Sequence, residues 1–228
     1  MKNRAANYLG LFFIAFLSLL MLPLLTGCSG LLAKQPLQTT TYYSLETAEP
    51  KALAAPVLNT DAVLNTNARL PTLVINTPKA AAGFDTRRMM YTRNQHQMEY
   101  FARNEWVDTP AHMLQTLMIA AIAETGDFNA VLPKYSLVKS ELRLETEIVR
   151  LIQIFSSKPS HVQFTLRASI IDNTTSKVIA SSEFSEKVNA ASDDPIGGVL
   201  AANQAVNAVL EKMSAFTHEA TIAWHKSM

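Results

Sequence analysis

The sequence predicts an α+β domain with a mainly antiparallel sheet and two principal helices packed on one face, preceded by a cleaved signal peptide and a tether. Two observations predict this fold. Three long segments, near residues 142–154, 162–170 and 178–184, alternate apolar and polar residues, which indicates strands with one polar face. Two segments that follow Pro110 and Pro195 repeat apolar residues at helical spacing. Helices covering one face of such a sheet form an α+β domain.

The composition excludes several classes of protein. The chain has 228 residues, of which 48% are hydrophobic and 17% are charged, so most of it is too apolar for a disordered protein. A net charge of +1 gives no electrostatic reason to expect a nucleic-acid partner. The single Cys excludes an intramolecular disulfide and a metal site built from several cysteines.

The N-terminus has the pattern of a secretory signal peptide. Lys2 and Arg4 precede an apolar run over residues 9–21. A transmembrane anchor is the alternative, but it needs roughly 20 apolar residues, and Pro23 and Gly27 end this run early. We therefore expect residues 1–27 to be a signal peptide that is removed on export.

Leu25-Thr26-Gly27-Cys28 resembles the bacterial lipobox, in which small residues lead to a Cys that receives lipid. The resemblance implies an S-linked diacylglycerol and an N-linked acyl chain on Cys28, and we expect no other cofactor. The alternative is a Cys that ends an apolar segment by chance. Several acyl chains would anchor the chain stably, since each buried CH₂ contributes about 0.8 kcal/mol.

Ser29 predicts which membrane the lipoprotein is sorted to. In enterobacteria-like sorting an Asp after the lipidated Cys retains the protein in the inner membrane, so Ser29 favours the periplasmic side of the outer membrane. Residues 28–39 then form a small, polar tether, and residues 40–225 form the domain.

The first half of the domain contains short elements. Residues 40–45 are rich in β-branched and aromatic residues and predict a strand, whereas residues 46–69 have no periodicity and predict a long loop. A second short strand is expected over residues 70–76. Residues 89–93 and 98–102 flank a polar turn and predict a hairpin.

Each predicted helix has a recognisable start. Thr109 and Pro110 supply an N-cap and a first helical residue, and Gly126 ends that helix before a short strand over residues 128–132. Residues 192–195 begin a last helix that runs to about Ala223. Its apolar stripe predicts packing on the sheet, with a coiled-coil seam between subunits, and so a homo-oligomer, as the alternative; the stripe consists of Val199, Ala202, Val206, Val209, Met213, Phe216 and Ala220.

The sequence lacks the motifs of common enzymes. It contains no G-x-G-x-x-G, Walker loop, H-E-x-x-H or G-x-S-x-G. The five His residues are scattered over different predicted elements. Glu145 and Glu147 form a carboxylate pair, but alternating charges on a strand are typical of its solvated face. We therefore expect neither catalysis nor a metal site.

The stretch from Gly83 to Trp106 is unusual because aromatic and Arg residues lie side by side on the predicted hairpin. These residue types dominate protein interfaces. We take Arg88, Tyr91, Tyr100 and Trp106 as candidate residues that contact a partner or determine the shape of its site. In the alternative interpretation the aromatic residues belong to the core and the Arg residues solvate its rim.

Four groups of residues resemble the ABC-type transport auxiliary lipoprotein family, which includes PqiC-like proteins. They are Phe84-Asp85-Thr86-x-Arg88-Met89-x-Tyr91, residues 99–114 around Tyr100 and Trp106, Pro159-Ser160-x-Val162, and Ala201-Ala202-Asn203-x-Ala205-Val206. The resemblance extends from about Tyr42 to the terminal helix and is least evident over residues 46–69. It implies a lipid anchor at Cys28 and no catalytic residues.

The resemblance also implies a function. A member of this family is expected to be an outer-membrane-anchored periplasmic component of an MCE-type lipid transport system, with an MCE-domain protein as its partner. We expect a non-enzymatic docking subunit. A carrier module that binds lipid in a pocket between the sheet and the helices is the alternative, and an envelope hydrolase is a third class that would require a clustered catalytic site.

Overall fold

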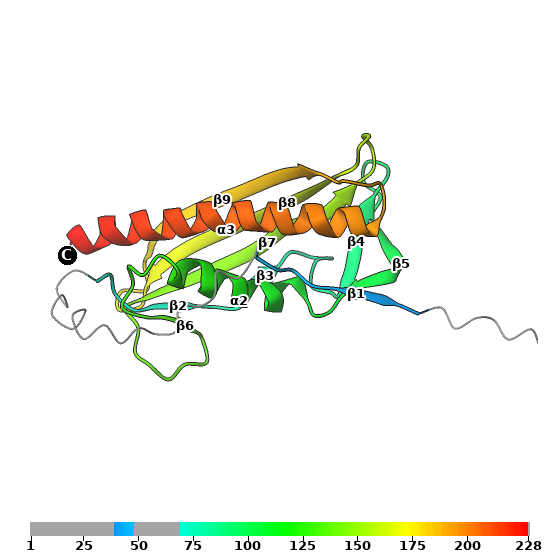
Figure 1. Ribbon diagram of the computed structural model, residues 1–228. Helices are drawn as coiled ribbons and strands as arrows, with labels where there is room; N and C mark the ends of the chain where they lie inside the picture. Colours follow the sequence, from blue (N-terminus) through cyan, green and yellow to red (C-terminus); the bar gives the residue numbers. More distant parts are fainter. Residues whose placement is uncertain (1–38, 48–68, 228) are drawn as a thin grey trace, which may run out of the picture. The chain divides into compact units, whose positions relative to one another are not determined.

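The computed structural model describes residues 39–47 and 69–227, and all of them except Thr39 belong to one compact unit that begins at Thr40. The predicted signal peptide, Cys28, most of the tether, and residues 48–68 of the predicted loop lie outside the described residues. The described part contains one nine-stranded sheet and two helices, which confirms the α+β fold (Figure 1). The strands are β1 (Thr41–Tyr43), β2 (Leu73–Ile75), β3 (Lys79–Ala80), β4 (Arg88–Thr92), β5 (Glu99–Trp106), β6 (Val131–Pro133), β7 (Leu142–Ile154), β8 (His161–Asp172) and β9 (Val178–Asn189).

The three long strands form the centre of the sheet. β8 pairs antiparallel with β7 on one side and with β9 on the other. The apolar positions of the predicted alternation, such as Leu144, Ile148, Phe164 and Leu166, are fully buried. The period of two therefore sets which face of each strand enters the core.

The shorter strands add parallel pairs that the sequence analysis did not predict. β2, β3 and β4 each pair in parallel with a different stretch of β7, and β1 pairs in parallel with β5. β6 extends the sheet beyond β2, also in parallel. The long ladders remain antiparallel, so the sheet is mixed but mostly antiparallel. Two- and three-residue strands carry too little alternation to reveal their direction.

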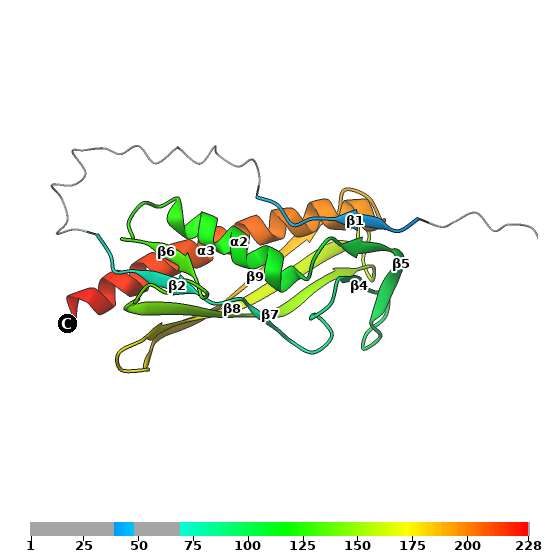
Figure 2. The ribbon, with the colours of Figure 1, turned by 90° about the horizontal axis from the view of Figure 1, so that it is seen from below.

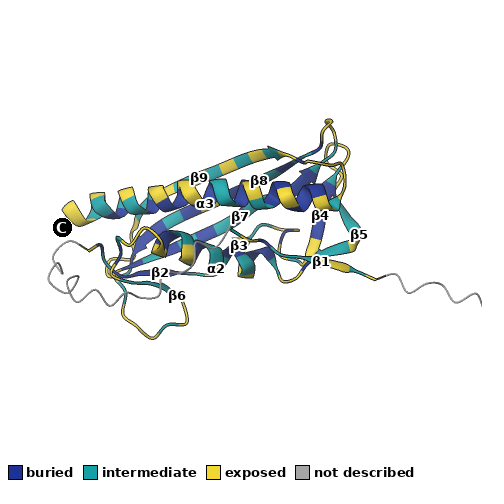
Figure 3. Cartoon of the chain, viewed as in Figure 1, coloured by how far each residue is buried: buried dark blue, intermediate teal, exposed yellow. Residues whose placement is uncertain are grey.

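Both helices, α2 (Pro110–Ala123) and α3 (Pro195–Lys226), lie on the same face of the sheet (Figure 2). α3 packs along β8 and β9 and also contacts α2. In the predicted stripe Val199, Ala202, Val206, Val209 and Met213 are buried, and Phe216 makes an edge contact with Phe184 of β9 with 5.6 Å between ring centroids. The stripe therefore packs on the sheet, as predicted (Figure 3).

Both ends of α2 and the start of α3 lie where the sequence signals predict them. Thr109 is the N-cap of α2, and Pro110 is its first residue. The helix ends at Ala123, and Gly126 has a positive φ of 71°, a conformation that glycine adopts without a steric penalty. Asp194 caps α3 by accepting a hydrogen bond from the backbone N–H of Gly197 at 2.8 Å. Among the described residues, neither helix is both long and apolar enough to cross a membrane.

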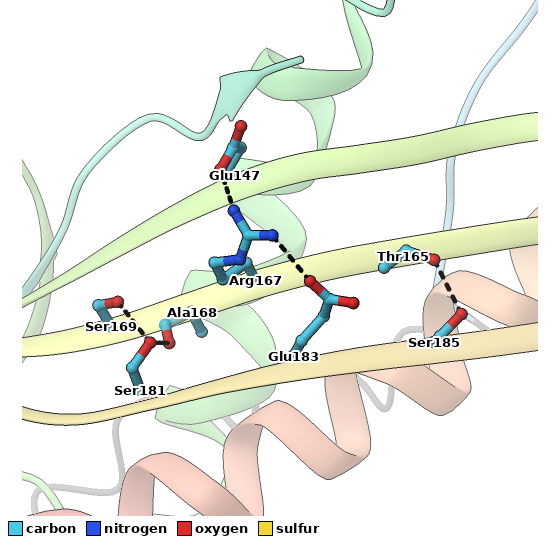
Figure 4. Close-up of polar contacts among 8 residues, drawn as sticks. All are labelled: Glu147, Thr165, Arg167, Ala168, Ser169, Ser181, Glu183 and Ser185. Atoms are coloured by element: carbon cyan, nitrogen blue, oxygen red, sulfur yellow. Dashed lines mark hydrogen bonds and ion pairs between the residues drawn. The ribbon is translucent and has the colours of Figure 1, made fainter.

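The outer face of the long strands carries hydrogen-bonded polar side chains (Figure 4). Arg167 on β8 bridges Glu147 of β7 and Glu183 of β9, with N–O distances of 2.9 Å to each. Hydroxyl pairs on the same strands continue the pattern, since Thr165 contacts Ser185 at 2.8 Å. Glu145, the second member of the carboxylate pair, is bonded to Arg143 at 3.0 Å. This face is therefore the solvated one that the alternation predicts.

Candidate partner-binding surface on strands β1, β4 and β5

The predicted hairpin is present and carries the candidate residues. β4 and β5 pair antiparallel, with Met90 opposite Tyr100 and Tyr91 opposite Glu99. The register shifts between Arg88 and Met90, which marks a bulge or irregularity in β4. Consistent with the shift, Met89 and Met90 are both buried although they are adjacent. β1 adds a third strand beside residues 104–106 of β5.

Three Arg–Tyr pairs lie on these strands or directly beside them, because Arg87 precedes β4 and Arg93 follows it. The guanidinium of Arg88 lies 3.8 Å from the centroid of the Tyr100 ring. Arg93 lies 5.0 Å from the ring of Tyr91, and a third pair joins Arg87 to Tyr42 at 5.3 Å. Exposed cation–π contacts contribute about 0.5–1 kcal/mol each. The three Arg side chains are exposed and are held over flat aromatic surfaces, an arrangement suited to protein contacts.

Tyr91 is a largely buried member of the surface. Its hydroxyl donates a hydrogen bond to the Glu99 carboxylate at 2.8 Å, and its ring packs 4.4 Å from that of Phe101. The hydrogen bond to Glu99 and burial raise the pKa of Tyr91 above its usual value, and the charge of Arg93 opposes the shift. The phenol therefore stays neutral and holds the hairpin in shape.

Trp106 belongs to the core. Its side chain is 5% exposed. Its backbone N–H donates to the carbonyl of Arg87 at 2.7 Å, and the Arg87 side chain returns a bond to the Trp106 carbonyl at 3.2 Å. Of the four candidates, Arg88 and Tyr100 therefore lie where a partner can reach them, whereas Tyr91 and Trp106 can act only by determining shape. For the latter two, burial matches the interpretation that assigned the aromatic residues to the core.

The structure adds residues that the sequence analysis did not single out. Arg87 and Arg93 lie in the same aromatic-rich stretch, one on each side of β4, and only their contacts with Tyr rings distinguish them from other exposed cations. Tyr42 is distant in the sequence, and it reaches this surface because β1 pairs with β5. No sequence signal connects it to the hairpin.

Two cavities bear on ligand binding. One of about 310 Å³ lies between the β4–β5 turn and the end of β7, lined by Thr92, residues 94–98, Arg150, Ile152, Ile154 and Ser156. The other lies between α3 and the sheet next to Gln153 and Gly198 and measures about 20 Å³, which is room for about one water. The smaller cavity is at the place where the carrier hypothesis expected a lipid pocket, and it is too small for a lipid.

A comparison with known protein families identifies the family of this chain. The family described as the ABC-type transport auxiliary lipoprotein component matches residues 52–214. The chain belongs to this family. The match confirms the resemblance found in the sequence and makes the protein an auxiliary lipoprotein of a transport system.

Solved structures share the fold of this auxiliary lipoprotein. A protein from Xanthomonas campestris of family DUF330 is 18% identical with a TM-score of 0.64, and the alignment covers 71% of this chain and 93% of that one. An uncharacterized protein is 10% identical with a TM-score of 0.59, covering 78% of this chain and 99% of that one. A comparison with curated proteins found no match.

The polar clusters of the auxiliary lipoprotein are explained by local pairing. In the described part of the chain no three His, Cys, Asp or Glu side chains are grouped so as to hold a metal ion. His112 pairs with Asp108 and His218 with Asp127. Ser157 contacts His161 Nδ1 at 3.0 Å. Burial, followed by the charge of Lys187, lowers the pKa of His161. No carboxylate orients this imidazole within the described residues, so the pair lacks the third group of a catalytic triad.

Proposed function

We propose that this auxiliary lipoprotein is a non-enzymatic docking subunit, held at the periplasmic side of the outer membrane by acyl chains on Cys28. Its α+β domain receives the periplasmic end of an MCE assembly and so helps to pass phospholipid or another hydrophobic molecule between membranes. The three Arg–Tyr pairs on and beside β1, β4 and β5 are the observation that supports this role. Membership of a transport auxiliary family supports it as well.

The anchor and the docking surface act together in this proposal. A tether confines the domain to a thin layer beside the bilayer, which raises the effective concentration of the docking surface for a partner that spans toward the same layer. A weak individual contact is then sufficient for stable attachment. This mechanism requires binding and positioning by the protein and no covalent chemistry.

The docking role is tested by co-purification with an MCE-domain partner. Arg88 and Tyr100 are the pair with the closest contact, at 3.8 Å, and both are accessible. We expect Arg88→Glu to reduce the recovered partner by about tenfold or more, because truncation of an interface hot spot, a class enriched in Arg, costs at least about 2 kcal/mol. Tyr100→Leu should have a smaller effect in the same direction.

The control is Lys187→Glu, which reverses an exposed charge on β9, a strand separated from β4 by β8 and β7. It should leave the recovery unchanged, and circular dichroism should show that each variant is folded. Wild-type recovery with a folded Arg88→Glu variant would show that this surface is not the docking site.

A periplasmic lipid carrier is a second candidate function, favoured by the cavity beside the β4–β5 turn. At about 310 Å³ it reaches the lower end of the range for ligand pockets, roughly 300–1,000 Å³, and Ile152 and Ile154 supply an apolar wall. Native mass spectrometry of the extracted protein distinguishes the two functions. One bound lipid per chain would support the carrier, and a lipid-free chain that still binds its partner would support docking.

A further inference from the structure

The loop between β6 and β7 exposes three apolar side chains. Leu137 is fully exposed at 104% of its reference area, Tyr135 is 82% exposed and Val138 is 57% exposed. The loop extends away from the sheet beside β6 (Figure 1) and is largely drawn as exposed (Figure 3). Single exposed apolar residues are ordinary, whereas contiguous exposed apolar surface rimmed by polar residues is typical of interaction sites. We call residues 134–139 the apolar loop.

Hydrogen bonds fix both ends of the apolar loop. At its start, the backbone N–H of Ser136 donates to the carbonyl of Pro133 at 3.0 Å. At its end, Asn173 in the β8–β9 turn donates from Nδ2 to the carbonyl and the hydroxyl of Ser140, at 3.0 and 2.9 Å. The backbone N–H of Asn173 also donates to the carbonyl of Glu141 at 2.9 Å. The apolar tip is therefore presented from a fixed base.

The charged residues within the apolar loop are both positive. Lys134 and Lys139 flank the three apolar residues, and no acidic residue occurs between Val131 and Ser140. Neither Lys forms an ion pair within the described residues. Lys177, which is exposed, lies in the same turn as Asn173 and adds a third cation beside the base of the loop. The Asp172 carboxylate next to Asn173 is buried and accepts the backbone N–H groups of Thr174 and Thr175 at 2.7 and 3.2 Å. Glu141 is the nearest acidic residue in the chain, and its carboxylate accepts the backbone N–H of Thr72 at 2.9 Å.

We propose that the apolar loop inserts into the interface of a bilayer that contains anionic phospholipid. Leu137 and Val138 enter the boundary of the acyl chains, and the Tyr135 ring lies at the level of the headgroups, where tyrosine is enriched. Lys134 and Lys139 extend their charges to the lipid phosphates. The combination of an apolar tip with unpaired cations on both sides matches an anionic membrane surface in both polarity and charge.

The test reads the depth of the loop in the full, lipidated chain, purified from membranes and reconstituted with vesicles. Tyr135→Trp places a fluorophore at the tip, and vesicles containing brominated phospholipid quench a tryptophan that enters the bilayer. The same measurement without the substitution gives the background of Trp106 and Trp224. We expect additional quenching with vesicles of phosphatidylglycerol and phosphatidylethanolamine, and little of it with phosphatidylcholine alone.

Substitutions in the apolar loop should reduce the added quenching. Leu137→Asp should abolish the added quenching, because it places a charge where the apolar tip enters the bilayer. Lys134→Glu with Lys139→Glu should reduce it severalfold, since each cation near an anionic surface contributes about fivefold to binding. Leu200→Asp, which alters a 52% exposed residue on α3, is the matched control and should change nothing.

The outcomes separate this proposal from the proposed function, on which it rests only in that the anchor brings the domain to a bilayer. Protein that floats with the vesicles but shows no added quenching overturns the loop proposal and leaves the anchor intact. Protein that does not float overturns both. Leu137→Asp that abolishes recovery of the protein partner without affecting quenching also overturns it, and assigns the loop to a protein contact.

Discussion

The contact between Gly198 and Gln153 shows how one residue sets the distance between α3 and the sheet. A Cβ at Gly198 would lie 2.1 Å from Oε1 and 2.7 Å from Cδ of Gln153, well inside van der Waals contact. The buried amide cannot easily move away, because its Nε2 donates to Ser160 at 3.0 Å and to the carbonyl of Asp194 at 3.2 Å. The absence of a side chain at Gly198 therefore allows the start of α3 to lie directly on β7.

We expect Gly198→Ala to destabilise the domain by about 1–3 kcal/mol, the usual effect of forcing extra atoms into a packed core. A loss of stability would be informative, because Gly→Ala inside a helix normally stabilises it by about 0.5–1 kcal/mol. Urea unfolding followed by circular dichroism measures the change.

Gln153→Ala provides the control for this contact. It removes the side chain that the new methyl group would meet, so the double variant should lose less stability than the two single variants added together. Strictly additive losses would show that the methyl group does not meet Gln153.

At the scale of an element, the start of α3 depends on its cap. The Asp194 carboxylate accepts the N–H of Gly197, and this bond is the main reason that the pKa of Asp194 lies below its usual value; the Ser192 hydroxyl, at 2.9 Å, adds to the effect. Because the folded-state pKa is depressed, the stabilisation is fully present above the unfolded value of about 3.9 and is lost as the pH falls through the folded value.

Asp194→Ala should therefore lower the free energy of unfolding at neutral pH, and its difference from the wild type should shrink below about pH 4. Asp194→Asn is the matched control, because an amide oxygen still caps the helix but does not titrate. Asp194→Asn should retain most of the stability at neutral pH. The difference in free energy of unfolding between Asp194→Asn and Asp194→Ala should stay the same below about pH 4. A difference between wild type and Asp194→Ala that stays constant down to low pH would contradict the assignment.

The elements that the sequence predicted well are those whose signals are local. Alternation over residues 142–154 identified β7, and the cap and stripe of α3 identified its start and its buried face. The parallel pairs of β2 and β3 could not be predicted, because strands of three and two residues are defined by their neighbours rather than by their own pattern.

In the candidate surface, too, the sequence predicted the features with local signals and missed those set by tertiary contacts. The sequence placed Arg88 and Tyr100 on a hairpin, but it could not separate them from Tyr91 and Trp106, which have the same residue character and are buried. That separation depends on the shift of register in β4 and on the arrival of β1 from a distant part of the chain. Both are tertiary effects with no local signal.

At the scale of the whole molecule, the proposed lipid anchor on Cys28 would determine where the domain acts. We expect the native protein to begin at Cys28 and to carry acyl chains, which mass spectrometry of the N-terminal peptide would detect. Cys28→Ser should abolish that modification and prevent processing of the leader at this position. A native chain that retains its leader, or a processed chain without acyl groups, would contradict this placement.

Sorting is a separate consequence of the same segment. Ser29→Asp should move the protein from the outer to the inner membrane in an enterobacterial host, as followed by density-gradient fractionation of the membranes. An unchanged distribution of the protein between the two membranes would show that residue 29 does not determine its sorting.

The position of β7 also constrains how the chain assembles. Within residues 39–47 and 69–227, β3 pairs with no strand other than β7, and β2 pairs with β7 and the short β6 alone. On the proposed export route the chain leaves a translocation pore amino end first, so β2 and β3 must wait until residues 142–154 have crossed, whereas β1, β4 and β5 can already pair with one another. During that interval β2 and β3 are unprotected against proteases and against mispairing, because contacts between distant segments form late. Any periplasmic chaperone that assists this protein should therefore act on its amino-terminal half, before the central strand arrives.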